Sequence, residues 1–299
     1  MKILSFGSMN IDNTYSVDEF VQPGETMTAK NLSKFCGGKG LNQSIALAAA
    51  GADVSHFGCV GEDGDILLDM LKSRGVNTDS VIKIDNITSG HAIIQVDSHG
   101  QNSILLYPGA NRRMTPELID RELEKYSCGD WLLIQNETNC LEYIMRAANK
   151  KGMKIAFNPS PMDGTVSTLP LELVDLFLVN EIEGAAVTGK EITEEITAEF
   201  EKLFPNAAVI LTLGKKGSVF KSEKDMLFQP SYCGTVKDTT GAGDTYTGFF
   251  IANYIKGVSP QECMRIAAMA STVQISRDGA AIAIPTKQEV LDALKNHCR

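Results

Sequence analysis

Basic charge is scarce in this sequence. The 299 residues include 28 Lys and Arg against 37 Asp and Glu, and the formal net charge is −9. Lysine and arginine form only small clusters, such as Lys215-Lys216. A nucleic-acid interface normally carries a basic stripe or patch, so we expect no nucleic-acid partner. An anionic ligand would have to be held by local donors against an unfavourable overall field.

Long apolar runs and signal-peptide features are also missing. No segment approaches the roughly eighteen uncharged residues that are typical of a transmembrane helix. The N-terminal segment 1–13 has no long apolar core and no cleavage-site pattern. We therefore expect no membrane partner and a cytoplasmic location.

The cysteines and histidines lack the spacing of a disulfide framework or a metal site. The seven cysteines are scattered without a Cys-x-x-Cys pair, and the four histidines show no metal-ligand spacing. An odd, scattered set of cysteines is typical of reduced thiols in the cytosol. We assign none of the histidines to catalysis.

Two familiar nucleotide-binding motifs are absent as well. The sequence has no Gly-x-Gly-x-x-Gly fingerprint, which argues against a nicotinamide-dependent oxidoreductase. The nearest approach to a Walker A loop is GAAVTGKE (184–191), which ends in Glu and follows an acidic helical turn rather than a strand. We interpret this segment as the end of a helix that Gly189 caps.

The sequence does contain a regular alternation of strand-like and helix-like segments. This pattern indicates a mostly parallel sheet that is covered by helices on both faces. We therefore predict a three-layer α/β/α fold that spans residues 1–299 as a single domain. The predicted strands are 2–13, 54–61, 130–137, 154–161, 175–183 and 207–214, and the predicted helices include 41–52, 63–75 and 140–152.

Polar residues end three of the predicted strands. They are Asn136-Glu137, Asn158 and Asn180. In open parallel sheets, ligands bind beyond the carboxyl ends of the strands. We therefore expect a ligand site at this edge of the sheet.

Two segments interrupt the alternation. Residues 12–35 lack helical periodicity and contain a Pro23-Gly24 turn. Residues 91–107 have the pattern of two strands joined around DSHGQN. We predict that both segments form a small β-sheet lid that projects from the main body. On pattern alone, edge strands of the main sheet are the alternative.

The segment TGAGD (240–244) precedes an apolar helical run. Gly241 and Gly243 allow a ligand to approach the backbone closely. The first N–H groups of the following helix have no intrahelical partners, and they form an anion-binding site. Taken alone, the motif is equally compatible with a catalytic loop and with Asp244 as a helix cap after a glycine turn.

A second glycine-rich turn, CGGKGLNQS (36–44), leads into another helix and carries Lys39, a cation suited to a phosphate or a sugar hydroxyl. The two turns together resemble those of the ribokinase family of carbohydrate kinases, of the phosphofructokinase-B type. Further short motifs follow in the order of that family. They are GSMNIDN (7–13), PGET (23–26), GCVGEDGDILLDMLKSRGVNT (58–78), PGAN (108–111), QNE (135–137), NPSP (158–161), VNEIE (179–183) and ILTLGKKGS (210–218).

The resemblance implies roles for residues of both turns. Asp244 would be the general base that accepts the proton of the acceptor hydroxyl. The amides of Gly241, Ala242 and Gly243 would stabilise charge on the transferred phosphoryl group. The implied sugar contacts are Asn10, Asp12, Gly38, Lys39, Asn42 and Glu137. For isolated residues such as the first two, turn chemistry at a strand end is the alternative.

On the nucleotide side, the resemblance implies that Asn180 and Glu183 organise Mg²⁺ and the ATP phosphates, with Glu183 acting indirectly. A helix capping box is the alternative, and the two roles are compatible. Thr212, Gly214 and Gly217 would form a nucleotide-binding turn after a strand. A plain strand-to-hairpin turn is the alternative for these three residues.

The resemblance also implies a monovalent-cation site. Asp238, Thr240 and Gly279 would hold K⁺ beside the anion-binding turn, because hard cations favour oxygen ligands. The segment RDGAAIAIP (277–285) departs from the family, since Ala283 stands where a serine hydroxyl is common. Backbone oxygens would have to replace that hydroxyl.

The resemblance therefore implies a sugar kinase that uses ATP and Mg²⁺ and is activated by K⁺. Ribose is the expected acceptor, because Lys39 and QNE (135–137) are closer to ribose kinases than to fructokinases or adenosine kinases. A related acceptor, such as 2-deoxyribose, a keto-deoxy sugar acid or a nucleoside, is the alternative, and a non-catalytic sugar-binding protein is a second class. Because lids of this family often pair, we expect a homodimer through the lid.

Overall fold

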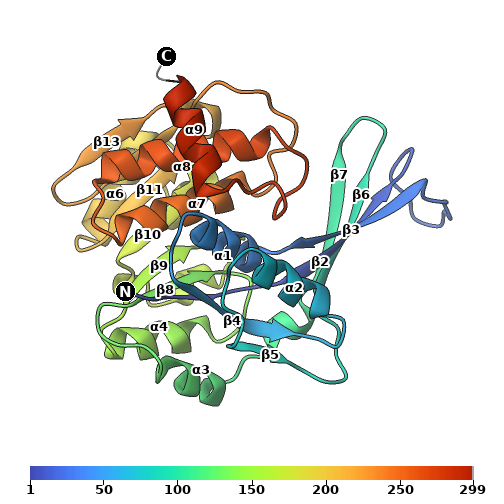
Figure 1. The fold of residues 1–299 in the computed structure, drawn as a ribbon, viewed down its shortest axis with the longest axis horizontal. Coiled ribbons are helices and arrows are strands. Elements are labelled where there is room, and N and C mark those ends of the chain that lie inside the picture. Colours follow the sequence, from blue (N-terminus) through green and yellow to red (C-terminus); the bar gives the residue numbers. More distant parts are fainter. Residues whose placement is uncertain (298–299) are drawn as a thin grey trace.

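The computed structural model describes residues 1–297 and is built around a nine-stranded sheet (Figure 1). The strand order is β13-β12-β11-β10-β9-β8-β1-β4-β5. Neighbours from β11 to β5 run parallel, and β12 and β13 add an antiparallel edge. The bounds are β1 Ile3–Phe6, β4 Val54–Val60, β5 Val81–Lys83, β8 Trp131–Gln135, β9 Lys154–Asn158, β10 Leu176–Asn180, β11 Ala208–Thr212, β12 Ser218–Lys221 and β13 Met226–Gln229.

The central strands are buried on both faces, as their continuous apolar sequences predict. Successive side chains enter opposite cores, so that Ile3 belongs to one hydrophobic cluster and Leu4 to the other. Helices α1, α2, α7, α8 and α9 pack into the first cluster, and α3, α4 and α6 into the second. The helix bounds are α1 Lys39–Ala49, α2 Asp65–Ser73, α3 Pro116–Leu123, α4 Leu141–Lys150, α5 Glu181–Thr188, α6 Thr193–Leu203, α7 Ala242–Tyr254, α8 Pro260–Ile275 and α9 Lys287–His297. This arrangement confirms the predicted three-layer α/β/α fold.

A second sheet projects from the main body, at the right of Figure 1. Its strand order is β3-β2-β6-β7, with bounds β2 Asn10–Ser16, β3 Asn31–Gly37, β6 Gly90–Val96 and β7 Asn102–Tyr107. The predicted small sheet is therefore confirmed, and residues 12–35 and 91–107 are not edge strands of the main sheet.

The prediction of one opening strand over residues 2–13 is wrong, because the chain changes sheets within it. β1 ends at Phe6 in the main sheet, and β2 begins at Asn10 in the second sheet. Between them, Ser8 O accepts a hydrogen bond from Leu41 N at 2.9 Å, and Met9 N donates to Asn111 Oδ1 at 3.0 Å. These backbone groups are bound to α1 and to a side chain instead of a neighbouring strand, so the sheet cannot continue.

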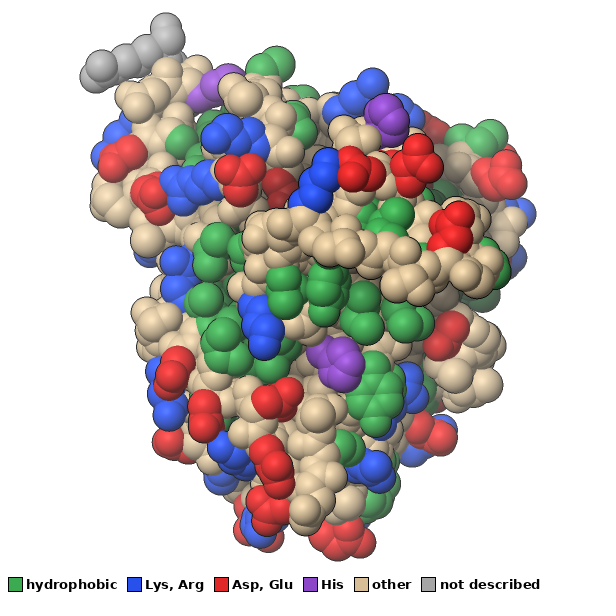
Figure 2. Space-filling view, turned by 90° about the vertical axis from the view of Figure 1, so that its right-hand side faces the viewer, with side chains coloured by type: hydrophobic (Ala, Val, Ile, Leu, Met, Phe, Trp, Pro, Cys, Tyr) green, Lys and Arg blue, Asp and Glu red, His purple; other side chains and the backbone are tan. Residues whose placement is uncertain are grey.

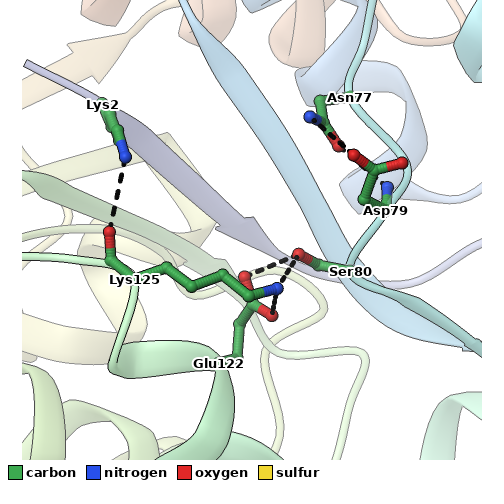
Figure 3. Close-up of polar contacts among 6 residues, drawn as sticks. All are labelled: Lys2, Asn77, Asp79, Ser80, Glu122 and Lys125. Atoms are coloured by element: carbon green, nitrogen blue, oxygen red, sulfur yellow. Dashed lines mark hydrogen bonds and ion pairs between the residues drawn. The ribbon is translucent and has the colours of Figure 1, made fainter.

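A polar cluster lies at the amino end of β1 (Figure 3). Within the described residues, its members form hydrogen bonds with one another. Glu122 is 6% exposed and accepts hydrogen bonds from Ser80 Oγ and from Lys125 Nζ, each at 2.6 Å. Lys2, which precedes β1, donates to the carbonyl of Lys125 at 3.5 Å. The expected ligand site lies at the opposite, carboxyl ends of the strands. Within residues 1–297, no helix has the length and apolarity needed to cross a membrane.

Candidate active site

Asp244 lies in the first turn of α7 and is 6% exposed. Asn42 Nδ2 donates to its Oδ2 at 3.0 Å, and Gln43 Nε2 donates to its Oδ1 at 2.9 Å. Each carboxylate oxygen therefore has one protein donor and keeps a second acceptor position. The two glycine-rich turns, far apart in sequence, meet at this carboxylate.

The start of α7 has the conformation that its glycines allow. Gly241 is the N-cap with φ +77°, a backbone conformation that favours glycine. Among the described residues, the N–H groups of Gly241 and Gly243 donate to no protein acceptor, whereas Ala242 N donates to Thr239 O at 3.2 Å. Two of the three amides assigned to the anion site are therefore available to a ligand without rearrangement.

Lys39 and Glu137 are two further polar residues that lie near Asp244. The backbone N–H of Lys39 donates to Glu137 Oε2 at 3.0 Å, and the hydroxyl of Ser8 donates to the same oxygen. Burial raises the pKa of Glu137, and these hydrogen bonds oppose the rise. Burial works to lower the pKa of Lys39, but the carboxylates of Asp244, Glu137 and Glu183 outweigh it and raise that pKa. Lys39 therefore stays a cation among three acidic groups.

Asp12 and Asn10 reach the site from β2, beside the N-cap Gly38. Burial, assisted by the charge of Glu137, raises the pKa of Asp12 to about 6. A Cβ at Gly37 would lie 2.0 Å from Asp12 Oδ2, so a larger residue there would require this carboxylate to move from its present position. Asn10 Oδ1 accepts from Asn111 Nδ2 at 2.8 Å, which fixes its orientation.

A cavity of about 80 Å³ connects this region with the ends of β10 and β11. Lys39, Gly243 and Asp244 line one side, and Asn180, Glu183 and Thr212 are among the residues on the other. Three of the five predicted nucleotide-side residues therefore share a cavity with the predicted base.

Two glycines of the predicted nucleotide turn lie outside this cavity lining. Gly214 begins the 3-10 turn Gly214–Lys216 after β11, and Gly217 caps its end with φ +123°. A Cβ at Gly217 would lie 2.1 Å from Gln229 O, so this glycine is required by the hairpin itself. The local backbone of these two residues is thus that of a strand-to-hairpin turn, which is the alternative to a nucleotide-binding turn.

The sequence assigns no role to Gln43, and it identifies Asn158 only as a polar strand end where a site is expected. Gln43 donates to Asn158 Oδ1 at 3.1 Å and accepts from Gln135 Nε2 at 2.7 Å. Asn158 Nδ2 donates to Glu183 Oε2 at 3.4 Å. A buried amide chain therefore links the predicted base to the predicted nucleotide side. Both residues belong to recognised motifs, GGKGLNQS and NPSP. Their contacts are with residues distant in sequence, so the motifs alone could not predict them.

Glu183 and Asn180 form the predicted capping box of α5. Glu183 N donates to Asn180 Oδ1 at 2.9 Å, and Asn180 N donates to Glu183 Oε2 at 3.0 Å. Glu183 Oε1 accepts no hydrogen bond from the described residues, and Glu183 is among the residues that line the cavity. A carboxylate with an unpaired oxygen at this cavity fits Mg²⁺, which binds oxygen ligands and keeps several waters.

The residues predicted to hold K⁺ are already bonded to one another. Asp238 Oδ1 accepts from Thr240 N at 2.8 Å, and Asp238 Oδ2 accepts from Gly279 N at 3.0 Å. The carbonyl oxygens of Thr240 and Gly279 accept from Gln274 Nε2, at 2.5 Å and 3.4 Å. A side-chain amide thus points at the oxygens that a cation would require, so the donor set does not fit the ion.

Comparison with known proteins extends these observations to the whole chain. Residues 1–287 match the family described as pfkB family carbohydrate kinase. The chain is 33% identical over 298 residues to a ribokinase of Haemophilus influenzae, with 97% of each chain covered. The structure is similar to that of a Thermotoga maritima ribokinase, with a TM-score of 0.88, 32% identity, and 98% and 99% of the two chains covered. For an Arabidopsis thaliana ribokinase complexed with ribose and ATP, the TM-score is 0.86 at 29% identity, with 98% of each chain covered.

The family match extends from the first residue to the start of α9. It therefore includes the nine-stranded sheet, the second sheet and both glycine-rich turns. The chain belongs to the pfkB family of carbohydrate kinases.

Proposed function

We propose that this protein transfers the terminal phosphoryl group of ATP to the primary hydroxyl of D-ribose, which yields ribose 5-phosphate and ADP. The observation that carries this proposal is the position of Asp244, where the Lys39 turn and the free amides of α7 meet. The relatives named ribokinase, one of them complexed with ribose and ATP, support the choice of acceptor.

In this proposal, Asp244 accepts the proton of the sugar hydroxyl as that oxygen attacks phosphorus. Asn42 and Gln43 hold its two oxygens, so the carboxylate does not have to reorient during the reaction. The amides of Gly241 and Gly243 stabilise negative charge on the transferred group, and the Ala242 amide joins them if its turn bond opens. Lys39 adds a positive charge on the sugar side.

Sugar recognition is assigned to Asn10, Asp12, Gly38, Lys39, Asn42 and Glu137. Carboxylate and amide side chains bracket adjacent hydroxyls because each offers two acceptor sites or a donor and an acceptor. The second sheet would act as a lid that excludes water from the bound sugar and so suppresses hydrolysis of ATP. We infer that it works with the main body as one kinase domain.

We infer that Mg²⁺ enters with ATP and is held through water by Glu183, with Asn180 beside it. The ion would neutralise charge on the phosphates. Thr212 would contact the nucleotide, and the turn of Gly214 and Gly217 would border it. We also infer a cytoplasmic location, because ATP is available there and the cysteines among residues 1–297 are free thiols.

We further infer that two copies of this chain pair through the second sheet. β7 is an edge strand of that sheet, and its Ile104 and Leu105 are 58% and 68% exposed. Figure 2 looks at this side of the molecule and shows hydrophobic side chains gathered across the middle of the face. A solution mass of two chains at micromolar concentration is expected, and Leu105→Lys is expected to shift it toward one chain.

The experiment that tests the proposed function is a coupled ATP assay over ribose, 2-deoxyribose, fructose, a keto-deoxy sugar acid and a panel of nucleosides. Ribose is expected to give the highest kcat/KM. A higher kcat/KM for 2-deoxyribose or a nucleoside would identify that compound as the acceptor and leave the kinase class unchanged. Sugar binding in calorimetry without phosphate transfer to any acceptor would identify a sugar-binding protein instead of an enzyme.

A further inference from the structure

Gln274 lies in the last turn of α8 and is completely buried. Its amide nitrogen donates to Thr240 O at 2.5 Å and to Gly279 O at 3.4 Å. A primary amide has two N–H donors, so one side chain can serve both carbonyls. The reversed amide would place Oε1 against the same two carbonyl oxygens, and this repulsion fixes the orientation that donates.

The carbonyls that Gln274 binds flank the anion-binding turn. Thr240 immediately precedes Gly241, and the backbone of Gly241 approaches Ala280, the neighbour of Gly279, so that a Cβ on Gly241 would lie 3.2 Å from Ala280 Cβ. A cation at these oxygens would need their lone pairs. An amide N–H occupies one lone pair of each carbonyl and presents partial positive charge at the place of the ion, so it competes directly with the ion.

Other neutral donors hold the same turn. Ser271 Oγ, also on α8, donates to Ala242 O at 2.9 Å. Lys237 N and Asp238 N donate to Ile275 O at 2.8 Å and 3.2 Å. Both oxygens of Asp238 already accept backbone N–H groups, from Thr240 and Gly279. The turn that carries the phosphate-binding amides is therefore bonded to the end of α8 by the protein alone.

Ala283 provides an independent observation on the same segment. Its side chain is 2% exposed and ends in a methyl group, which supplies no ligand to an ion. Each oxygen of the Asp238 carboxylate accepts one backbone N–H, and the two nearest carbonyls are bonded to Gln274. A cation here would therefore have to compete with a protein donor at each of these four oxygens, and Ala283 would add no ligand to it.

We propose that the amide of Gln274 takes the place of a bound monovalent cation, so that the anion-binding turn keeps its active geometry without K⁺. Gln274 is a positioning residue that acts through Thr240 and Gly279. The kinetic test of this proposal rests on the proposed kinase activity. The thermal test does not, because binding of an ion can be measured without catalysis.

The first test uses the wild-type chain in chloride salts of K⁺, Na⁺ and tetramethylammonium at equal ionic strength. We expect kcat in the three salts to agree within about twofold, since an ion that does not bind cannot change the population of the active form. The thermal midpoint without substrates is expected to agree within about 1 °C for the same reason. A saturable stimulation by K⁺ of about tenfold or more, or a K⁺-specific rise of the midpoint, would overturn the proposal.

The second test removes the amide. Gln274→Ala is expected to lower kcat about tenfold or more in tetramethylammonium, with partial recovery on adding K⁺, because the two carbonyls become free to bind an ion. Gln274→Met, which keeps the volume without the donor, is expected to lose activity without recovery. Gln288→Ala, on the exposed face of α9, is the matched control and should respond to no ion.

The outcomes distinguish this inference from the proposed function. A wild-type chain that phosphorylates no acceptor in any salt contradicts the kinase proposal, and the thermal midpoints still decide on ion binding. A wild-type chain that phosphorylates ribose only with K⁺ contradicts the role of Gln274 and leaves the kinase proposal in place. If Gln274→Ala or Gln274→Met fails to fold, the wild-type salt series still decides the proposal.

Discussion

Asn42 Nδ2 lies 3.0 Å from Asp244 Oδ2, although 202 residues separate the two in sequence. The contact joins the first turn of α1 to the first turn of α7, and the two helices pack side by side along the main sheet (Figure 1). Two helix N-termini therefore converge on one carboxylate. Their partial positive ends favour an anion at this point, whether it is the side chain of Asp244 or a phosphoryl group.

Asp244→Asn should keep the shape of the side chain and remove its ability to accept a proton. We expect kcat for ribose to fall by about 10²–10⁴-fold, which is the usual contribution of general base catalysis. Binding of ATP should change little, because the nucleotide-side residues are intact. A coupled assay and an ATP titration check the two parts, and turnover within about tenfold of wild type would contradict the role of Asp244.

Gln43→Leu should show what the amide chain contributes to the base. The substitution removes a donor to Asp244 and an acceptor for Gln135, and leaves the buried Gln135 amide without that partner. We expect the free energy of unfolding to fall by about 1–3 kcal/mol and kcat to fall more than the KM for ATP changes. Denaturant titration and steady-state kinetics measure these effects. Gln101→Leu, in the exposed turn between β6 and β7, is the control.

The raised pKa of Asp12, about 6, predicts a pH dependence of sugar binding. Below this pKa the carboxyl is protonated, so it loses acceptor capacity for sugar hydroxyls. The KM for ribose should therefore rise as the pH falls from 7.5 to 5.5, while the KM for ATP follows a different profile. In Asp12→Asn, the KM for ribose should be higher at pH 7.5 and lack this dependence. An unchanged profile in the variant would assign the titration to another group.

The same pKa predicts an effect on stability with a definite sign. The folded-state pKa of Asp12 lies above its ordinary value of 3.8, so the folded protein binds more protons between these two pH values. Ionised Asp12 therefore destabilises the fold above about pH 6, and this cost disappears as the pH falls toward 3.8. We expect Asp12→Asn to raise the thermal midpoint at pH 7.5 more than at pH 4.5. Scanning calorimetry of both proteins at both pH values measures the difference.

Glu122→Ala should weaken the fold without touching the chemistry. Its carboxylate accepts from Ser80 and Lys125 (Figure 3), at the amino end of the sheet. Asp244 lies at the start of α7 and is not part of this cluster. Removing the Glu122 carboxylate leaves the buried Ser80 hydroxyl without that acceptor, and we expect about 1–3 kcal/mol lower stability. The kcat should be unchanged at a temperature where the variant is folded. Glu124→Ala, an exposed neighbour, is the control in denaturant titration.

Most of the fold follows from local pattern. β8 and β10 are short apolar runs that end in polar residues, and the helices between strands carry one apolar face, so their burial is encoded in each segment. The change of sheet after Phe6 is not encoded in this way. It depends on bonds from Leu41 and to Asn111, which are distant in sequence.

The candidate site shows the same difference between residues recognisable from local motifs and residues whose contacts arise only in the fold. Asp244, Lys39 and Glu183 stand in recognisable motifs, so the sequence could name them as candidates. Gln274 stands inside an ordinary helix, and its role depends on contact with a carbonyl 34 residues away. The raised pKa of Asp12 likewise arises from burial and from Glu137 on another strand end. Such effects exist only after folding has brought the groups together.

The passage of the chain from β1 into β2 has a consequence for evolution. Asn10 and Asp12 belong to the second sheet, whereas Asp244 and the anion-binding amides belong to the main body. In the proposed function, part of the recognition of the acceptor thus lies on a different sheet from the transfer step. Substitutions in β2 and its neighbours can change the preferred acceptor while the phosphate chemistry is conserved, which gives such a scaffold a simple route to new substrates.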